Sequence, residues 1–323
     1  MRRLVSCAIS ALALCASSQA SATFSIVAVD LRDGSLGGAV ASCVALDTIK
    51  QVYGAVPGHG AIMTQSYLLP RAHTDALVWL SAGQSPDSVV SQLTQGSYDA
   101  DFELRQYAVV SPAGEIANFS GSGANAFTGH LAFEVRDPES QARRYVVAAQ
   151  GNFLTGQAVL EGARQGFDGD ACDLPARLLN ALRAAGSAVQ GDARCTPNGT
   201  PAESALLAVD PPTFPQGSYL TLTSEVSAPA TEDPIAGLVQ QFADWRLAHP
   251  CEAAGAGGGA AGAASVPRDA GTDGGGCQVG AVSADPPGWR ALGHIGVLAL
   301  AALGAGLRRR YATPHPRKTS KMR

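Results

Sequence analysis

"SATFSIVAVD", residues 21–30, joins the end of an export signal to the first strand of the fold. Two arginines near the N-terminus precede an apolar stretch, and residues 20–22, Ala-Ser-Ala, form a small-residue cleavage site. This pattern is typical of a secretory signal peptide, so we predict that residues 1–22 are removed and that the mature chain begins at Thr23. A lipoprotein signal at Cys15 is an alternative, which the bulky leucine before that cysteine disfavours.

Apolar runs and turn signals after the cleavage site predict an α+β domain. The runs at 23–30 and 36–44 are joined by an Asp-Gly turn, which is a hairpin signal. The other predicted elements are an extended segment at 53–65, strands at 106–110, 115–121, 143–152, 203–210 and 218–226, and helices at 74–82, after Ser85, and at 157–165, 174–185 and 235–245. Because strands and helices come in blocks, we predict one domain over residues 23–249, with two antiparallel sheets and helices outside them.

The composition changes after this domain. Residues 250–287 are rich in Gly and Ala, without an apolar period, and indicate a linker. We predict a transmembrane helix over residues 288–307, which contains an apolar run of about 17 residues, near the lower limit for a span. A basic tail over residues 308–323 then stays in the cytoplasm, and the domain is extracytoplasmic. A buried core helix is the alternative interpretation of the apolar run.

The cysteines suit an oxidising compartment, because five of the seven remain after the signal is removed. Cys172 and Cys195 bracket a helical stretch, and we predict a disulfide between them, which contributes about 3 kcal/mol in the chain-entropy model. Cys43 lies in an apolar run and is predicted to be a buried thiol. Cys251 has no obvious partner in the sequence.

Several short motifs resemble those of a bacterial family, domain of unknown function family 1028, over nearly all of residues 23–248. They are TFSIVAVD (23–30), GGAVAS (37–42), MTQSY (63–67), LRQYAVV (104–110), GH (129–130), AAQGN (148–152) and EDPIAGLVQQF (232–242). The resemblance implies the N-terminal-nucleophile hydrolase superfamily, whose fold is a four-layer αββα sandwich. Active members of that superfamily use the first residue of the mature chain as the nucleophile, whereas the reaction of this family is unassigned.

The C-terminal end resembles a second known signal, the myxobacterial sorting tail. The resemblance covers GCQVG at residues 276–280, the spacer, the apolar helix and the arginine run. It implies that Cys277 is a handle for a sorting protease, so that the protein is either anchored to the inner membrane or transferred to the cell surface. The composition alone indicates only a membrane tether.

The resemblance gives Thr23 a chemical role as the catalytic nucleophile. A hydroxyl is a weak nucleophile at neutral pH, and an N-terminal threonine carries its own base, the α-amine. The reference pKa of an α-amine is about 7.7 to 8.0, so a useful fraction is unprotonated at working pH. One extra residue before Thr23 would turn this amine into an amide. The alternative is that Thr23 only begins a strand, where β-branched residues are common.

Other polar residues are candidates for the same site, and each also has a structural interpretation. Candidates for oxyanion or substrate binding are Ser42, Thr64, Gln65, Arg105, Gln150, Gly151 and Asn152. Weaker candidates are Cys43, His130 and Asp192. Amides at strand ends also satisfy backbone groups, Arg105 is also expected to pair with Glu103 or Asp101, and His130 is also expected to be simply hydrogen bonded.

The sequence narrows the function to two classes. It lacks H-E-x-x-H, G-x-S-x-G, Walker and dinucleotide motifs, so we predict no metal and no cofactor. A net charge of −4 without a basic stripe outside the tail argues against nucleic acid. The first hypothesis is an exported amidohydrolase acting on a small amide or peptide-like substrate. The second is a non-catalytic surface module that binds cell-wall material, and a homo-oligomer is open in both.

Overall fold

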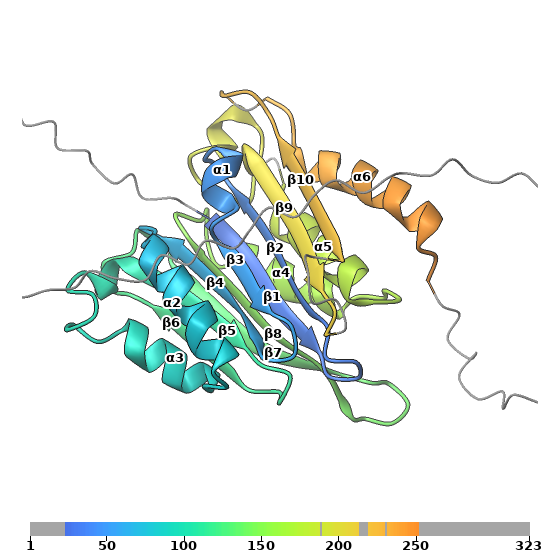
Figure 1. The fold of residues 1–323 in the computed structure, drawn as a ribbon. Helices are drawn as coiled ribbons and strands as arrows, with labels where there is room; N and C mark the ends of the chain where they lie inside the picture. The colour runs from blue at the N-terminus through green and yellow to red at the C-terminus, as the bar shows by residue number, and fades with distance from the viewer. Residues whose placement is uncertain (1–22, 188, 213–218, 230, 252–323) are drawn as a thin grey trace, which may run out of the picture. The chain divides into compact units, whose positions relative to one another are not determined.

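The computed structural model describes residues 23–187, 189–212, 219–229 and 231–251. Its larger sheet has six antiparallel strands in the order β10-β9-β2-β1-β8-β7. Their bounds are Thr23–Asp30 (β1), Leu36–Ser42 (β2), Gly129–Arg136 (β7), Arg143–Asn152 (β8), Ser204–Asp210 (β9) and Leu220–Glu225 (β10). The first strand of the domain therefore lies inside the sheet, between β2 and β8 (Figure 1).

The smaller sheet has four antiparallel strands in the order β3-β4-β5-β6. Their bounds are Tyr53–Val56 (β3), Gly60–Ser66 (β4), Arg105–Val110 (β5) and Ile116–Ser120 (β6). The helices are Leu46–Ile49 (α1), Pro70–Ser81 (α2), Pro86–Leu93 (α3), Ala158–Asp168 (α4), Leu174–Ala185 (α5) and Pro234–Ala248 (α6). Short 3₁₀ helices cover Phe102–Leu104 and Thr196–Asn198.

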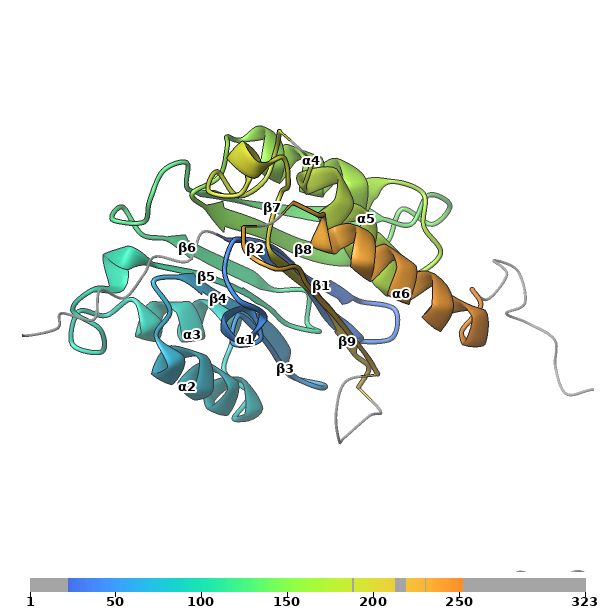
Figure 2. The same ribbon diagram turned by 90° about the horizontal axis from the view of Figure 1, so that it is seen from above.

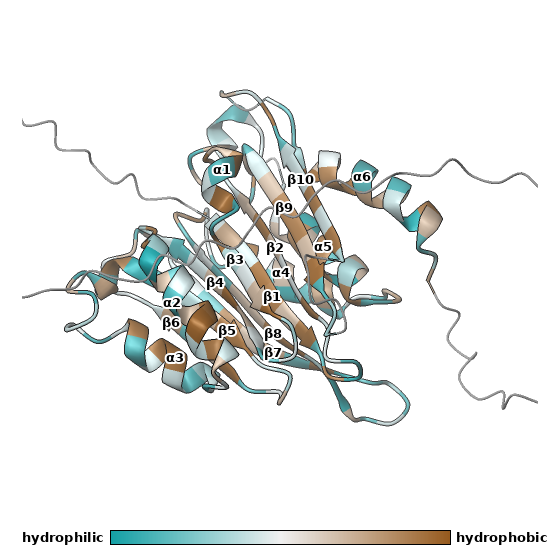
Figure 3. Ribbon diagram, viewed as in Figure 1, coloured by the Kyte–Doolittle hydropathy of each residue, from teal (hydrophilic) through white to brown (hydrophobic). Residues whose placement is uncertain are grey.

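The two sheets pack face to face, with helices on their outer faces (Figure 2). Helices α2 and α3 cover the four-stranded sheet, and α4, α5 and α6 cover the six-stranded sheet. Each of the three interfaces holds its own apolar cluster, one between the sheets and one under each helix layer. In Figure 3 the apolar residues are concentrated on the central strands, which are covered on both faces.

Strand β1 shows why its sequence is a continuous apolar run. Successive side chains of a strand point to opposite faces. Phe24 and Ile26 pack under the helices, whereas Val27 and Val29 pack between the sheets. Both faces are buried, so both sets are apolar. The same alternation places the side chain of Thr23 between the two sheets.

Close approach of the sheets requires a glycine on β2. A Cβ atom at Gly38 would overlap the side chains of Tyr53 and Met63 from the opposite sheet. The glycine therefore allows β2 to lie against β3 and β4. A larger residue here would push the sheets apart next to the strand that begins at Thr23.

The predicted α+β fold with two antiparallel sheets and helices is confirmed. The segment predicted as one extended stretch at 53–65 is instead a hairpin, β3 and β4, because Gly58 turns the chain with a φ of 79°. Helix α2 begins at Pro70 rather than Thr74, since proline suits the first turn of a helix. Strand β7 was not predicted, although Leu131, Phe133 and Val135 alternate with more polar residues as expected for an edge strand.

The disulfides differ from the predicted pairing. Cys43 is bonded to Cys195, and Cys172 is bonded to Cys251. The predicted bond between Cys172 and Cys195 is therefore not formed, and Cys43 is not a free thiol. Sequence proximity favoured the wrong pair, because Cys43 and Cys195 are 152 positions apart in the chain and meet only in the folded protein. The first bond joins the residue after β2 to the segment before β9, and the second joins the segment after α6 to the segment before α5.

The predictions for the two ends of the chain lie outside the described residues. These are the signal peptide at 1–22, the linker after residue 251 with Cys277, the transmembrane helix at 288–307 and the basic tail. Among the helices that the structure does describe, none is long and apolar enough to cross a membrane.

Candidate functional site at the start of strand β1

Several polar strand ends meet around Thr23. Ser42, the last residue of β2, and Asn152, the last residue of β8, both lie opposite Thr23 in the sheet register. From the facing sheet, Gln65 on β4 and Gln106 on β5 extend into the same layer between the sheets. All five side chains belong to fully buried or almost fully buried residues. The layer between the sheets is therefore apolar over most of its length and polar at this end.

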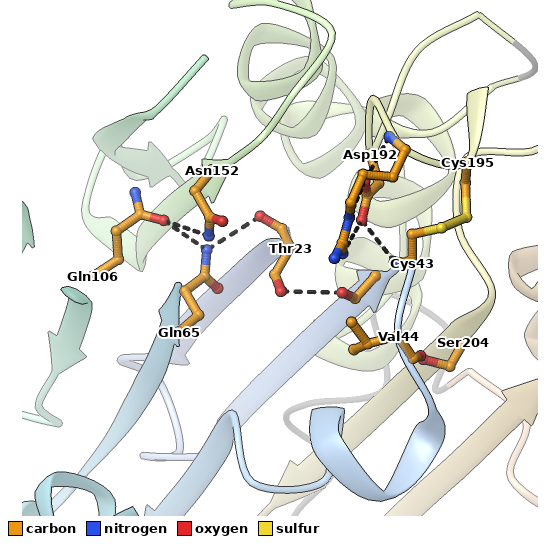
Figure 4. Close-up of polar contacts among 11 residues, drawn as sticks. Thr23, Cys43, Val44, Gln65, Gln106, Asn152, Asp192, Cys195 and Ser204 are labelled. Carbon is orange, nitrogen blue, oxygen red and sulfur yellow. Dashed lines mark hydrogen bonds and ion pairs between the residues drawn. A yellow bond between two sulfur atoms is a disulfide. The ribbon is translucent and has the colours of Figure 1, made fainter. Parts of the chain in front are cut away.

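Thr23 is held through both its side chain and its backbone. Its Oγ1 donates a hydrogen bond to Ser42 Oγ over 3.2 Å, and its carbonyl oxygen accepts one from Gln65 Nε2, also over 3.2 Å. Figure 4 shows the amides of Gln65 and Asn152 beside Thr23, and a dashed line marks the hydrogen bond from Gln65 to the carbonyl oxygen of Thr23. The residue is 0% exposed in the full chain, where a peptide bond still joins it to Ala22.

Gln106 is the centre of the amide network. Its Nε2 donates to the backbone carbonyls of Gly129 and Gly151, over 3.2 and 3.0 Å. Carbonyls only accept, so these contacts fix the orientation of the Gln106 amide. Its Oε1 then accepts hydrogen bonds from Gln65 Nε2 over 3.1 Å and from Asn152 Nδ2 over 3.0 Å. The orientation of three buried amides is thus set by two backbone groups.

A buried carboxylate fixes the end of β2 beside the site. Asp192 is 0% exposed, and its Oδ2 accepts a hydrogen bond from the backbone N–H of Cys43 over 2.7 Å. Arg194 pairs with the same carboxylate through its guanidinium, at 2.8 Å. The Cys43–Cys195 disulfide joins the same two segments covalently. Ser42, directly before Cys43, is therefore held by two independent attachments.

Two residues that flank the site have unusual backbone angles. Ser66, at the end of β4, has a φ of 76°, and Phe153, directly after Asn152, has a φ of 52°. The left-handed region costs non-glycine residues roughly 1 to 3 kcal/mol, and such residues cluster at functional sites. The chain therefore turns sharply next to both Gln65 and Asn152.

Glycine at position 151 has a packing role. A Cβ atom there would lie 2.6 Å from Leu154 Cδ1, on the helix side of β8. The carbonyl of Gly151 faces the network and accepts from Gln106. Gly151 was predicted to donate its backbone N–H to an oxyanion, but the contact that it makes with the network is through its carbonyl oxygen, which accepts.

Two predicted site residues point away from Thr23. Thr64 lies on the helix side of β4, where its Oγ1 donates to the carbonyl of Gln51 over 3.1 Å. Arg105 binds Asp99 at 2.8 Å, rather than Glu103 or Asp101, and donates to the carbonyl of Tyr67. Both residues belong to the outer face of the four-stranded sheet. The structure therefore does not bring them together with Thr23.

His130 lies at the edge of the network. Its Nδ1 is 2.9 Å from Ser120 Oγ, and that hydroxyl accepts a hydrogen bond from Gln106 over 2.8 Å. Partial desolvation lowers the pKa of the His130 imidazole below its usual value. The histidine thus contacts the amide network through Ser120.

Sequence reasoning missed Gln106, although it lies in the quoted motif LRQYAVV. The alternation of that strand separates its residues into two faces, and Gln106 shares the inward face with Ala108 and Val110. A polar residue at the end of an otherwise apolar strand face was the available signal. The charge of its outward neighbour Arg105 instead suggests a ligand contact at that position.

Metal binding has little support among the described residues. Two groups have the spacing of metal ligands, and each consists of a disulfide and one carboxylate, Glu203 in one and Asp173 in the other. Oxidised sulfur atoms do not provide the thiolate that metals bind. The polar residues around Thr23 are amides and hydroxyls, which suit hydrogen bonding to a neutral ligand.

The fold and the site together define an α+β protein of two stacked sheets, in which a threonine begins a central strand at a buried polar end. A family model described as "Family of unknown function (DUF1028)" matches residues 23–238, and the chain belongs to this family. The chain is similar to the crystal structure of protein SPO2555 from Silicibacter pomeroyi, also matched to DUF1028. The two are 26% identical with a TM-score of 0.54, over 70% of this chain and 90% of that chain. No curated protein matches the sequence.

Proposed function

We propose that the mature chain is an exported amidohydrolase of the N-terminal-nucleophile type, with Thr23 as the nucleophile. The observation that carries the proposal is the position of Thr23, whose hydroxyl lies between the sheets among buried amides and hydroxyls. The family match begins at this same residue. An N-terminal threonine supplies both a hydroxyl nucleophile and an amine base.

The reaction follows from these two groups. Thr23 Oγ1 attacks the carbonyl carbon of an amide, and the α-amine takes the hydroxyl proton. The amine then returns this proton to the leaving nitrogen as the C–N bond breaks, which leaves an ester on Thr23. Water attacks the ester carbonyl and loses a proton to the amine, which returns it to Thr23 Oγ1 as the ester C–O bond breaks, so that the acid is released and the hydroxyl and the free amine are regenerated. Ser42 Oγ, 3.2 Å from Thr23 Oγ1, is the donor that we assign to the oxyanion.

The surrounding network has a positioning role in this proposal. Gln65 holds the carbonyl of Thr23, and Asn152 lies opposite Thr23 on β8. The Asn152 Oδ1 atom has no hydrogen-bond partner among the described residues. We assign this acceptor to an N–H of the α-amine or of the substrate.

Export would also activate the protein. The amine exists only after the peptide bond between Ala22 and Thr23 is cut, so removal of the predicted signal would create the base. The predicted C-terminal tail, with a sorting protease acting near Cys277, would then keep the enzyme at the membrane or on the cell surface. The proposed substrate is a small amide or peptide-like molecule outside the cytoplasm.

The experiment identifies the N-terminus first and its reactivity second. Mass spectrometry of the secreted protein is expected to show a chain that begins at Thr23. A hydroxyl-reactive β-lactone probe is expected to add once to this chain and not to Thr23→Ala, while Thr23→Ser keeps labelling. Thr221→Ala, on the exposed side of β10, is the matched control and should label normally.

The proposal fails if the mature chain starts at another residue, or if Thr23→Ala is labelled as strongly as the natural protein. A chain with one extra glycine before Thr23 gives a further check, because it keeps the hydroxyl and removes the amine. It is expected to lose at least about a hundredfold in labelling rate, in the range that general acid–base catalysis contributes.

A second candidate function, a surface binding module, is favoured by a cavity at the opposite end of β1. The cavity has a volume of about 470 Å³, and its lining includes Asp30, Asp173, Trp245 and Arg246. It combines an aromatic side chain with charged groups, as polar ligands require. A free Thr23 that the β-lactone does not label would favour this function over hydrolysis.

A further inference from the structure

Gln150 is a buried amide without a hydrogen-bond partner. It lies on β8 opposite Ser25 of β1 and is 0% exposed. Neither its Nε2 nor its Oε1 has a partner among the residues that the structure describes. Buried polar groups are nearly always hydrogen bonded in proteins, so an amide with two unpaired atoms requires an explanation.

The neighbouring amides cannot supply these partners, because the network already uses them. Ser25 Oγ donates to Gln65 Oε1 over 2.6 Å, and Gln65 Nε2 donates to Thr23 and Gln106. Gln106 is held in turn by the two backbone carbonyls at residues 129 and 151. Flipping any of these amides by 180° would break hydrogen bonds whose direction is set by the two backbone carbonyls. No flip of these neighbouring amides therefore gives Gln150 a partner without breaking another hydrogen bond.

Gln150 and Asn152 present their unpaired atoms on the same face of β8. Residues two positions apart in a strand point to the same side, and both side chains enter the layer between the sheets. Together they offer one donor, Gln150 Nε2, and two acceptors, Gln150 Oε1 and Asn152 Oδ1. Asn152 is directly opposite Thr23, and Gln150 is one same-face step further along.

A donor next to an acceptor is the pattern that a carboxamide recognises. One C=O of a ligand amide would accept from Gln150 Nε2, while its N–H groups would donate to the two oxygen atoms. The nearby charged pair, Asp192 and Arg194, is already satisfied by mutual contacts, and the imidazole of His130 is on the neighbouring strand. A carboxylate ligand would bring a negative charge against two acceptor oxygens.

We infer that Gln150 and Asn152 recognise a neutral carboxamide group of the substrate, so that the substrate class is a carboxamide-bearing amide or peptide. This inference rests on the proposed function, because it places the recognised group beside the Thr23 nucleophile. It assigns binding to Gln150 and leaves the chemical steps to Thr23.

The test measures binding without catalysis. It uses the mature Thr23→Ala protein and three small probes, the α-methyl esters of N-acetyl-glutamine, N-acetyl-glutamate and N-acetyl-norleucine, of which only the first carries a primary carboxamide. Isothermal titration is expected to show that the glutamine probe binds at least about tenfold more tightly than the other two. In Thr23→Ala with Gln150→Leu this preference is expected to disappear, because the complementary donor and acceptor are lost. Gln95→Leu, an exposed glutamine after α3, is the matched control.

Folding does not limit the test. Leucine has nearly the volume of glutamine and leaves no unpaired atom, so Gln150→Leu is expected to melt at the same temperature or higher. Equal binding of the three probes, no binding of any of them, or a preference that survives Gln150→Leu would each overturn the inference. The binding test does not depend on catalysis, because Thr23 is already replaced. If the glutamine probe is preferred but the β-lactone does not label the natural protein, only the hydrolase mechanism is rejected.

Discussion

At the residue scale, Gln106 is the side chain that links the two buried amides of Gln65 and Asn152 to the backbone of the larger sheet. It accepts from two amides and donates to two carbonyls and to Ser120. We predict that Gln106→Leu lowers the free energy of unfolding by about 2 to 4 kcal/mol, because it leaves several buried polar groups unpaired. Urea unfolding of the mature protein, followed by circular dichroism, measures this loss.

The comparison with Gln150→Leu makes this prediction specific. Both substitutions place leucine between the same sheets, but only Gln106 has partners to lose. Gln150→Leu is expected to change the free energy of unfolding by less than about 0.5 kcal/mol or to raise it. Equal destabilisation by the two variants would show that packing, and not hydrogen bonding, determines the stability of this layer.

The residue scale also shows what the sequence does and does not predict of the site. The cleavage site predicts Thr23 as the first residue of the mature chain, and the resemblance to the family predicts its role and, through the motifs MTQSY and AAQGN, the candidates Gln65 and Asn152. Thr64 and Gln65 are adjacent in one strand, so only one of them can face Thr23. Both faces of β4 and β5 are buried, and apolar residues occupy both, so the pattern alone does not reveal which face meets the other sheet. The same ambiguity led to Arg105 instead of Gln106.

At the scale of elements, strand β2 is positioned by contacts that are distant in sequence. It pairs with β9, and Cys43, directly after β2, is bonded to Cys195, whereas the sequence predicted a local bond between Cys172 and Cys195. Hairpins, caps and single helices follow from nearby residues, and the side chains of Ser85 and Asp173 cap the starts of α3 and α5, close to the predicted helix starts. Disulfide connectivity depends on which strands become neighbours, and spacing does not determine it.

The two disulfides have different expected effects on the site. We predict that Cys43→Ala with Cys195→Ala lowers the free energy of unfolding by about 2 to 5 kcal/mol and also slows β-lactone labelling of Thr23. The labelling effect follows because Ser42, which binds Thr23 Oγ1, directly precedes Cys43. Labelling rates by mass spectrometry and urea unfolding measure the two effects separately.

The second disulfide is the matched control for this prediction. Removal of Cys172 and Cys251 is expected to lower stability by a similar amount, since both bonds close long loops. The labelling rate of Thr23 should stay unchanged, because Cys172 lies at the start of α5, by the cavity at the other end of β1. Equal slowing in both variants would mean that general destabilisation, and not the position of Ser42, controls the reactivity.

At the scale of the whole molecule, helix α6 is fixed to the start of helix α5 just before the predicted linker. Its apolar residues Ile235 and Leu238 are buried against the larger sheet. Arg246 forms two hydrogen bonds with Asp173, at 2.7 and 2.8 Å, and Cys251 is bonded to the preceding residue, Cys172. Cys251, two residues beyond the predicted domain end at 249, is thus covalently bonded to the domain.

This geometry predicts a sharp difference between two mature chains that differ by one residue. A chain that ends at Cys251 is expected to melt within about 1 °C of the full mature protein, because the Gly- and Ala-rich linker has no core to contribute. A chain that ends at Pro250 loses the second disulfide, and its free energy of unfolding should fall by about 2 to 5 kcal/mol. For a domain of this size, that corresponds to a melting temperature lower by roughly 5 to 15 °C. Calorimetry in the absence of reductant measures the difference, and dithiothreitol should abolish it. If the two chains melt together without reductant, Cys251 does not hold the end of α6, and the domain ends where the sequence alone placed it.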